Sequence, residues 1–111
     1  MQIKVDLCFW GHVHQYERTC GMKNFTCAER DEDAPVHVVI GMAGNTYQSP
    51  WITRDPPPHS YGGSHQVQPD WSIFRTDNFG YSRLEVSANH LHFEMIGDNR
   101  GEVHDVLDLH K

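Results

Sequence analysis

The sequence has no long apolar run and no leader-like start. None of its apolar stretches approaches the roughly 18 residues that a membrane span needs. Residues 1–10, MQIKVDLCFW, lack the cationic start and the long apolar centre of a signal peptide. We therefore expect no membrane span and no secretory leader within these 111 residues.

Basic residues are scarce and nowhere clustered. Lys and Arg number 9 against 15 Asp and Glu, which gives a net charge of −6. Nucleic-acid-binding proteins usually carry a basic patch, so nucleic acid is not an expected partner. An acidic chain that acts on an anionic substrate needs positive charge from elsewhere, and a bound metal ion is one source.

Amphipathic helical periodicity is also absent, and the pattern that is present favours β-structure. Residues 36–40 (VHVVI) are mostly β-branched, and residues 91–96 alternate apolar and polar side chains. A polar, irregular stretch is predicted for residues 15–35 and a long proline-rich loop for residues 46–70. The predicted strands are residues 4–10, 36–40, 79–86, 91–96 and 103–109.

The first predicted strand is continuously apolar, which is typical of a strand covered on both faces. Such a strand needs neighbouring strands and layers, and few residues of this chain are available to supply them. Two interpretations stay open. Either the partners lie in another chain, or the sequence is the C-terminal piece of a larger protein.

The cysteines number only three, which limits the chain to one disulfide. Cys8 lies in an apolar run and is predicted to be a buried free thiol. Cys20 and Cys27 bound a short loop that contains a glycosylation sequon at Asn24. A sequon inside a Cys-to-Cys loop favours an oxidising compartment and a Cys20–Cys27 disulfide, although two unpaired thiols stay an alternative.

Histidine is abundant, and one pair directly follows a predicted strand. GHVH places His12 and His14 after the apolar segment that ends at Trp10. In an extended chain both rings would share one face, whereas in a loop each imidazole could reach a different ion. Neutral imidazole is a common metal ligand, and active sites of α/β proteins gather at the carboxyl ends of strands.

The other histidines have more ordinary interpretations. His90 and His92 repeat the His-x-His spacing on a predicted half-buried strand, where they are expected to form a solvated face. His37, on a predicted strand, is expected to be a hydrogen-bonded structural residue. The remaining histidines have no motif of other candidate site residues around them in the sequence; they are His59, His65, His104 and His110.

A longer string than GHVH points to a family. GHVHQYER behind an apolar strand resembles the last signature block of the purple acid phosphatases, especially the plant-type enzymes, which belong to the calcineurin-like metallophosphoesterases. The resemblance extends over residues 5–109. Its further segments are CGMKNFTC, APVHVVIGMAGN, QPDWSIFRTDNFGYSRLEV and GDNRGEVHDVLDL.

The resemblance implies an α/β (α+β) metallophosphoesterase fold, of which this chain would be a β-sandwich fragment of strands and loops with little helix. It implies a centre of one ferric ion and one divalent ion (zinc, manganese or iron) that hydrolyses phosphate monoesters at acidic pH. Carried over, His12 would bind the divalent ion and His14 the ferric ion. Two cations about 3.5–4 Å apart stabilise both the attacking and the leaving oxygen.

Three residues that follow the histidines need separate roles. Arg18 could steer phosphate and Glu17 could orient a ligand histidine. The favoured interpretation is structural, with Glu17 and Arg18 in buried ion pairs and Tyr16 packed beneath the loop. Asn45 resembles a turn residue of the family and is not expected to be a ligand.

The chain departs from the family pattern because the earlier ligand blocks are missing. We expect residues 1–111 to be an incomplete C-terminal portion of a catalytic domain, from a truncated gene model, a pseudogene or a short isoform, and to be weak or inactive alone. The alternative is a non-catalytic β-rich module that binds protein or metal. The resemblance implies a phosphate monoester substrate, the absent N-terminal part as partner, a homodimer as an open possibility, and a secreted or vacuolar location.

Overall fold

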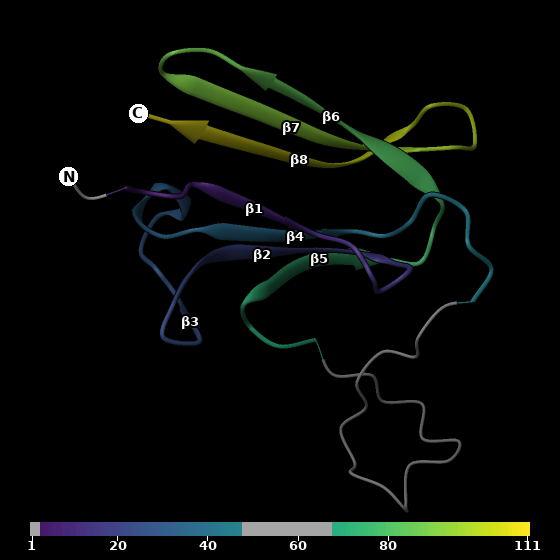
Figure 1. The fold of residues 1–111 in the computed structure, drawn as a ribbon, viewed down its shortest axis with the longest axis horizontal. Coiled ribbons are helices and arrows are strands. Elements are labelled where there is room, and N and C mark those ends of the chain that lie inside the picture. The colour runs from purple at the N-terminus through teal and green to yellow at the C-terminus, as the bar shows by residue number, and fades with distance from the viewer. Residues whose placement is uncertain (1–2, 48–67) are drawn as a thin grey trace, which may run out of the picture.

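Two β-sheets stack face to face in the computed structural model, which describes residues 3–47 and 68–111 (Figure 1). Most of the predicted loop 46–70, with His59 and His65, lies outside the described residues. The strands are β1 Leu7–Trp10, β2 Tyr16–Lys23, β3 Thr26–Cys27, β4 Val36–Ile40, β5 Ser72–Thr76, β6 Gly80–Val86, β7 His90–Gly97 and β8 Val103–His110, and a 3-10 helix η1 spans Asp31–Asp33.

The first sheet is built around β4. Its strand order is β1-β4-β2-β3, and β5 pairs with the other side of β2. β1 runs parallel to β4, whereas β2 runs antiparallel to both β4 and β5. The β-branched run of β4 suits a central strand, and its Val36 and Val38 are fully buried. The strand predicted over residues 36–40 is confirmed.

The second sheet is an antiparallel meander in the order β6-β7-β8. Phe93 and Met95 point into the core, while His92 and Glu94 lie on the outer face, as the alternation predicted. The turn between β7 and β8 contains Gly101 with a φ of 65°, a backbone conformation that glycine adopts without a steric penalty. The three predicted C-terminal strands are therefore confirmed.

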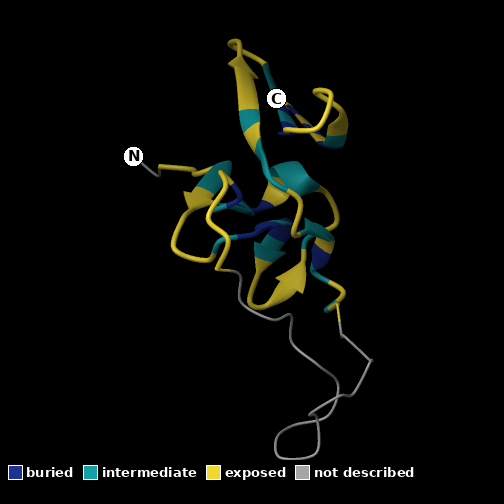
Figure 2. Cartoon of the chain, turned by 90° about the vertical axis from the view of Figure 1, so that its right-hand side faces the viewer, coloured by how far each residue is buried: buried dark blue, intermediate teal, exposed yellow. Residues whose placement is uncertain are grey.

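The hydrophobic core lies between the two sheets. The ring of Tyr16 from β2 stacks on Phe93 from β7, with centroids 6.4 Å apart and an interplanar angle of 6°. Figure 2 shows buried residues where the sheets face each other and exposed residues on the outer surfaces. The core side chains are Tyr16, Val36, Val38, Met42, Phe93, Met95, Leu107 and Leu109.

Residues 15–35 are not irregular, so that prediction is wrong. They form β2, β3 and η1, and most of β2 is buried. The polar residues Arg18 and Thr19 have buried hydrogen-bond partners, which allows them to lie inside a sheet. β5, Ser72–Thr76, was missed, since it lies just after the predicted loop 46–70 and no strand was predicted between residues 40 and 79.

β1 is not doubly covered, which corrects a second prediction. It begins at Leu7 and pairs only with β4 within the described ranges 3–47 and 68–111. Phe9 and Trp10 are 42% and 53% exposed. Apolar composition predicted a strand buried on both faces, but only one face is covered. There Leu7 packs against the core and the Phe9 ring lies 5.7 Å from the Phe93 ring, and the described residues supply no second neighbour strand.

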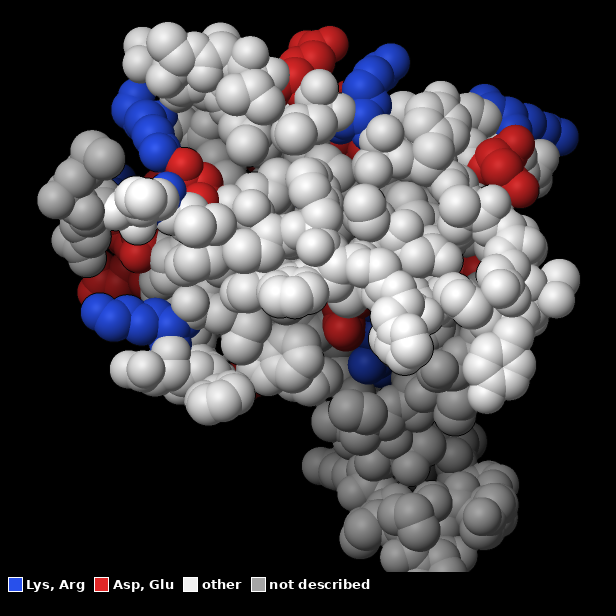
Figure 3. Space-filling model, in the orientation of Figure 1, with Lys and Arg blue, Asp and Glu red and all other residues white. Residues whose placement is uncertain are grey.

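Charge is distributed without a dominant basic patch on the face that Figure 3 shows. Blue and red side chains lie mostly along the edge of that face, a small red and blue patch lies low in its middle, and most of the centre is white. Within the described part of the chain, no helix is long and apolar enough to cross a membrane.

Candidate functional site

The connection between β1 and β2 carries His12 and His14. It turns twice, through hydrogen bonds from the Val13 amide to the Gly11 carbonyl (2.7 Å) and from the Gln15 amide to the Val13 carbonyl (2.9 Å). The Gly41 amide, just after β4, donates to the Gln15 carbonyl at 3.1 Å. Because β1 and β4 are parallel, the loops that follow them meet at the same sheet edge, where α/β sheets bind ligands.

Gly41 lets this connection lie close to the end of β4. A Cβ atom at position 41 would be 1.8 Å from the Val13 carbonyl oxygen and 3.2 Å from the Cα of His14. Such a contact with backbone is not possible without moving the loop, so the position of His14 depends on the missing side chain at Gly41.

His12 is exposed and has a left-handed backbone, with a φ of 64°. A non-glycine residue in this region costs about 1–2 kcal/mol, and such residues cluster at functional sites. The two histidines therefore lie in a turning loop, and not in an extended segment that would place both rings on one face. Of the two backbone alternatives, the loop is the one observed, and the binding of a different ion by each imidazole stays a prediction.

His14 is half-buried and its ring is fixed by a backbone contact. Its Nδ1 lies 2.7 Å from the Tyr47 carbonyl oxygen. Because a carbonyl oxygen only accepts, Nδ1 must carry a proton, and in the neutral form of the ring the lone pair is then on Nε2. A histidine that binds metal through one nitrogen commonly donates the other to a carbonyl or carboxylate.

β2 is held to the second sheet by a buried polar group. Asp105 on β8 accepts hydrogen bonds from the Tyr16 hydroxyl (2.6 Å), the Arg18 Nε (2.7 Å) and the Arg18 Nη2 (3.0 Å). Burial, followed by the hydrogen bond to Asp105, raises the pKa of Tyr16 well above its usual range. The phenol therefore stays protonated as a donor, which favours a structural role for Tyr16 and Arg18.

Glu17 has a different contact from the predicted ion pair. Its carboxylate accepts a hydrogen bond from the Ser72 hydroxyl of neighbouring β5, at 2.7 Å. Asn45 accepts a hydrogen bond from the Tyr47 amide at 2.8 Å, which shapes the turn after β4. His37 accepts a hydrogen bond from the Trp10 indole at 2.9 Å, in agreement with its predicted structural role.

The predicted Cys20–Cys27 disulfide is present and joins β2 to β3, with Cα atoms 5.6 Å apart. Asn24 lies exposed in the turn between these strands, and its glycosylation stays a prediction. Cys8 is a free thiol as predicted, but it is only half-buried because its strand is not covered on both faces.

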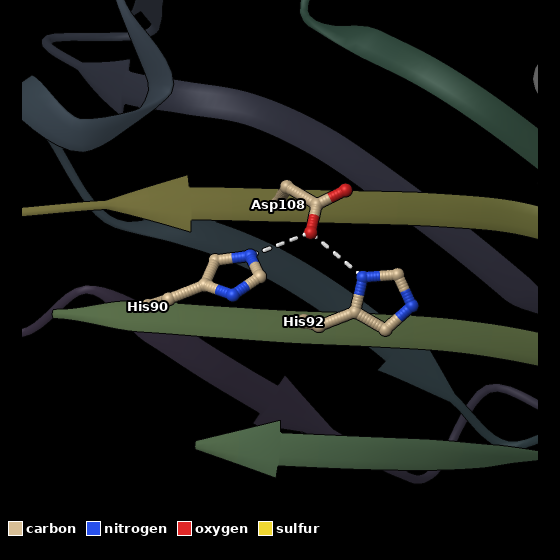
Figure 4. Close-up of side chains that lie close together, drawn as sticks. All are labelled: His90, His92 and Asp108. Atoms are coloured by element: carbon tan, nitrogen blue, oxygen red, sulfur yellow. Dashed lines mark hydrogen bonds and ion pairs between the residues drawn. The ribbon is translucent and has the colours of Figure 1, made fainter. Parts of the chain in front are cut away.

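His90 and His92 form a cluster that sequence reasoning missed. The His90 Nε2 and the His92 Nδ1 each lie 2.7 Å from the Asp108 Oδ1 (Figure 4). The signal was available in principle, because His92 and Asp108 lie opposite each other in the antiparallel register of β7 and β8. That register could not be read from the histidine spacing alone.

Hydrogen bonding changes the charge balance of this cluster. Contacts with Glu94 and then Asp108 raise the pKa of His92, and contacts from His92 and then His90 lower the pKa of Asp108. Among residues 3–47 and 68–111, His90, His92 and Asp108 are the only group of three side chains placed to share a metal ion. His12 and His14 belong to no such group there.

Comparison with known sequences identifies the family. The family model described as "Iron/zinc purple acid phosphatase-like protein C" matches residues 34–106, which is more than half of the chain. The chain belongs to the purple acid phosphatase family. The expectation drawn from GHVHQYER and the following segments is thereby confirmed at the level of family.

Two relatives illustrate the range of the family. The chain is 42% identical over 110 residues to "Probable inactive purple acid phosphatase 9" of Arabidopsis thaliana, a match that covers 95% of this chain and 16% of the relative. It is 31% identical to "Nucleotide pyrophosphatase/phosphodiesterase" of Hordeum vulgare, covering 97% of this chain and 28% of the relative. The chain thus spans 16% and 28% of the lengths of these two relatives.

A solved structure shows the same arrangement of strands. The purple acid phosphatase PPD1 from yellow lupin (Lupinus luteus) seeds superposes with a TM-score of 0.74 at 26% identity, covering 96% of this chain and 18% of that one. The predicted fold class, a metallophosphoesterase fold represented here mostly by β-strands, is confirmed by this match and by the scarcity of helix.

Proposed function

We propose that this chain supplies a pair of histidine ligands to a two-metal centre that hydrolyses phosphate monoesters within a longer polypeptide. The observation that carries the proposal is the loop after β1. It combines a strained, exposed His12 with a His14 whose Nδ1 is held by the Tyr47 carbonyl, at 2.7 Å. This arrangement leaves the His14 Nε2 available as a ligand at the sheet edge where the loops after β1 and β4 meet.

The residues present fit part of such a centre. His14 has the backbone partner that ligand histidines usually have, and His12 is exposed to solvent. We assign His12 to a divalent ion (zinc, manganese or iron) and His14 to ferric iron. Ferric iron prefers anionic oxygen ligands, and the described residues place none in a group with these histidines.

Each residue of the loop then has a limited task. His12 and His14 bind and orient, the Tyr47 carbonyl fixes the tautomer of His14, and Gly41 leaves room for the loop. When bound, the two ions would supply the positive charge that a phosphate ester and its hydrolysing water need. The 111-residue chain alone should have weak activity or none.

We further propose that residues 1–111 are the C-terminal portion of a larger catalytic domain. The exposed Phe9 and Trp10 and the open edge of β1 would be covered by strands that residues 3–47 and 68–111 do not supply. The chain also spans only 16% of a relative that it matches at 42% identity. The disulfide and the exposed sequon support a secreted or vacuolar location.

A second candidate is a non-catalytic β-rich module. It is favoured by the name of the Arabidopsis thaliana relative, "Probable inactive purple acid phosphatase 9", and by the lack of other metal-binding side chains grouped with His12 and His14 in the described ranges. In this case the loop after β1 would be retained for its packing and would bind no metal ions.

A chimera tests the proposal. Residues 5–109 replace the matching segment of an active purple acid phosphatase, and hydrolysis of p-nitrophenyl phosphate is measured at acidic pH. We expect the chimera to be active, and His14→Ala to lower kcat/KM by at least about a hundredfold, because the ferric ion loses a ligand. His37→Ala, which removes a histidine whose ring contacts Trp10, is the matched control.

Two results would overturn the catalytic proposal. A folded chimera that is inactive would support the non-catalytic module. A chimera that is equally active with alanine at both His12 and His14 would show that the loop binds no ion. High phosphatase activity in the isolated 111-residue chain would contradict the claim that it is incomplete.

A further inference from the structure

We propose that His90, His92 and Asp108 form a second metal site, for a divalent ion of the zinc type, on the outer face of the β6-β7-β8 sheet. No assignment made above uses this face. The site would stand whether or not the loop after β1 takes part in phosphate hydrolysis, because it rests on other residues and on another sheet.

The three side chains already converge on one point. The His90 Nε2 and the His92 Nδ1 both lie 2.7 Å from the same oxygen of Asp108, and Figure 4 shows both rings turned toward this carboxylate. The three candidate ligand atoms all lie within 4.8 Å of one another. Two imidazoles and a carboxylate, completed by water, are a ligand set that zinc takes in proteins.

The second nitrogen of His92 is also placed as in a metal site. Its Nε2 lies 3.0 Å from the Glu94 carboxylate, and Glu94 is in turn paired with Arg83 at 2.6 Å. Metal-binding histidines usually donate their other N–H to a carboxylate, which fixes the ring and makes it a better ligand. The chain Arg83–Glu94–His92 would hold His92 in the orientation that binding requires.

The strand register gives the site a rigid base. His92 lies directly opposite Asp108, and His90 lies opposite His110, in the ladder between β7 and β8. The His110 ring stacks on the His90 ring, with centroids 4.4 Å apart, so a further imidazole lies beside the three candidate ligands. Ligands carried by paired strands are positioned more accurately than ligands carried by loops.

An ion could reach this site from solvent. The side chains of His90 and Asp108 are each 41% exposed, and that of His92 is 30% exposed. A hollow of about 310 Å³ lies beside the two histidines and is lined also by Glu85, Val86 and Ser87. The Glu85 position, opposite His92 in the register of β6 and β7, adds a further carboxylate to this face.

The site is well separated from the loop that carries His12 and His14. Lys111 forms an ion pair with Asp6 at 2.6 Å, which places the end of β8 beside the start of β1. His12 and His14 follow the opposite end of β1, and Figure 1 shows the two regions at opposite ends of the strands. Binding at one pair can therefore be measured without substitutions at the other.

The test is a Zn²⁺ titration of the purified 111-residue chain by calorimetry at about pH 7.5, with histidine ring signals followed by NMR. We expect Zn²⁺ to shift the ring signals of His90 and His92 in the unsubstituted chain. His92→Ala and Asp108→Asn should each lower the Zn²⁺ association constant at the site by at least about tenfold, and Glu94→Gln by about tenfold. Acidification to about pH 5.5 should weaken binding, because the histidines must lose their protons.

His104→Ala is the matched control. It removes a half-buried histidine of β8 that lies outside the candidate site, and it should change the Zn²⁺ affinity by less than about twofold. The NMR measurement needs no substitution, so it keeps its meaning if a variant fails to fold. Zn²⁺ that leaves the His90 and His92 signals unmoved would overturn the proposal. Equal affinity of the unsubstituted chain and a folded His92→Ala variant would overturn it too.

Discussion

The two His-x-His pairs of this chain have the same spacing and opposite surroundings. His12 and His14 lie in a loop that turns twice, with a left-handed residue and no carboxylate grouped with them among the described residues. His90 and His92 lie in a regular strand and share one carboxylate oxygen of Asp108. The difference shows that a spacing of two predicts neither the backbone nor the partners. Those depend on what the neighbouring strand and loop supply.

The two pairs also depend on different parts of the fold. The loop pair, His12 and His14, lies just before Tyr16 and Arg18, whose buried contacts with Asp105 fix the start of β2 to the second sheet. The strand pair rests on the ladder between β7 and β8 and on surface hydrogen bonds. Substitutions that separate these supports should therefore affect the two pairs unequally.

The largest effect should come from Asp105→Ala. This change leaves the Arg18 guanidinium and the Tyr16 hydroxyl buried without their acceptor, and we expect a loss of about 3–5 kcal/mol in the free energy of unfolding. Urea denaturation of the 111-residue chain provides the measurement. The matched substitution on the outer face of β8 is Asp108→Ala, which should cost less than about 1 kcal/mol in metal-free buffer. Equal losses for the two variants would contradict the distinction between inner and outer carboxylates.

A smaller and more local effect should come from Gly41→Ala. The added Cβ would lie 1.8 Å from the Val13 carbonyl oxygen, so the loop with His12 and His14 must move. We expect a loss of about 1–3 kcal/mol in the free energy of unfolding. NMR should show shifted signals for His12 and His14 and unchanged ring signals for His90 and His92. Gly11→Ala is the control, since a Cβ there meets nothing within 4 Å.

His12→Gly should stabilise the chain slightly. Glycine removes the steric cost of a left-handed backbone, which is about 1–2 kcal/mol. It also loses more conformational entropy on folding, which destabilises the folded chain by about 0.5–1 kcal/mol. The net gain in the free energy of unfolding should be about 0.5 kcal/mol, measured by urea denaturation. The same substitution at His92, in a regular strand, should destabilise. A loss of stability in His12→Gly would show that the left-handed φ of 64° does not strain the loop.

The smallest effect concerns pH. The pKa of His92 is raised in the folded chain, so its contribution is fully present below the unfolded value near 6.5 and is lost as the pH rises through the folded value. The pKa of Asp108 is lowered, so its contribution is present above the unfolded value near 3.8 and is lost as the pH falls through the folded value. The stability difference between the unsubstituted chain and His92→Gln should therefore be largest between these two unfolded values. A difference that grows steadily above neutral pH would contradict these directions.

The sequence was most informative where a pattern was local. The β-branched run of β4 and the alternation of β7 each predicted the observed strand, because each depends on residues that are neighbours in the chain. The Cys20–Cys27 disulfide was also within reach, since only a short loop separates the two cysteines.

The sequence failed where a partner is remote. β2 appeared too polar for a buried strand. The residue that neutralises Arg18 is Asp105, which lies 87 positions further along the chain, so a local pattern could not reveal it. β1 appeared central because its apolar residues indicate a buried strand, whereas the described residues leave Phe9 and Trp10 exposed. The cluster around Asp108 needed the register of β7 and β8, which residue spacing does not encode.

The central claim is that the loop pair, and not the strand pair, holds the iron of a two-metal centre. The most direct test is the iron content of the chimera that carries residues 5–109, measured by elemental analysis for His14→Ala and for His92→Ala. Iron should be lost from the His14→Ala chimera and kept in the His92→Ala chimera. A His14→Ala chimera that is folded and keeps its full iron content would contradict the account.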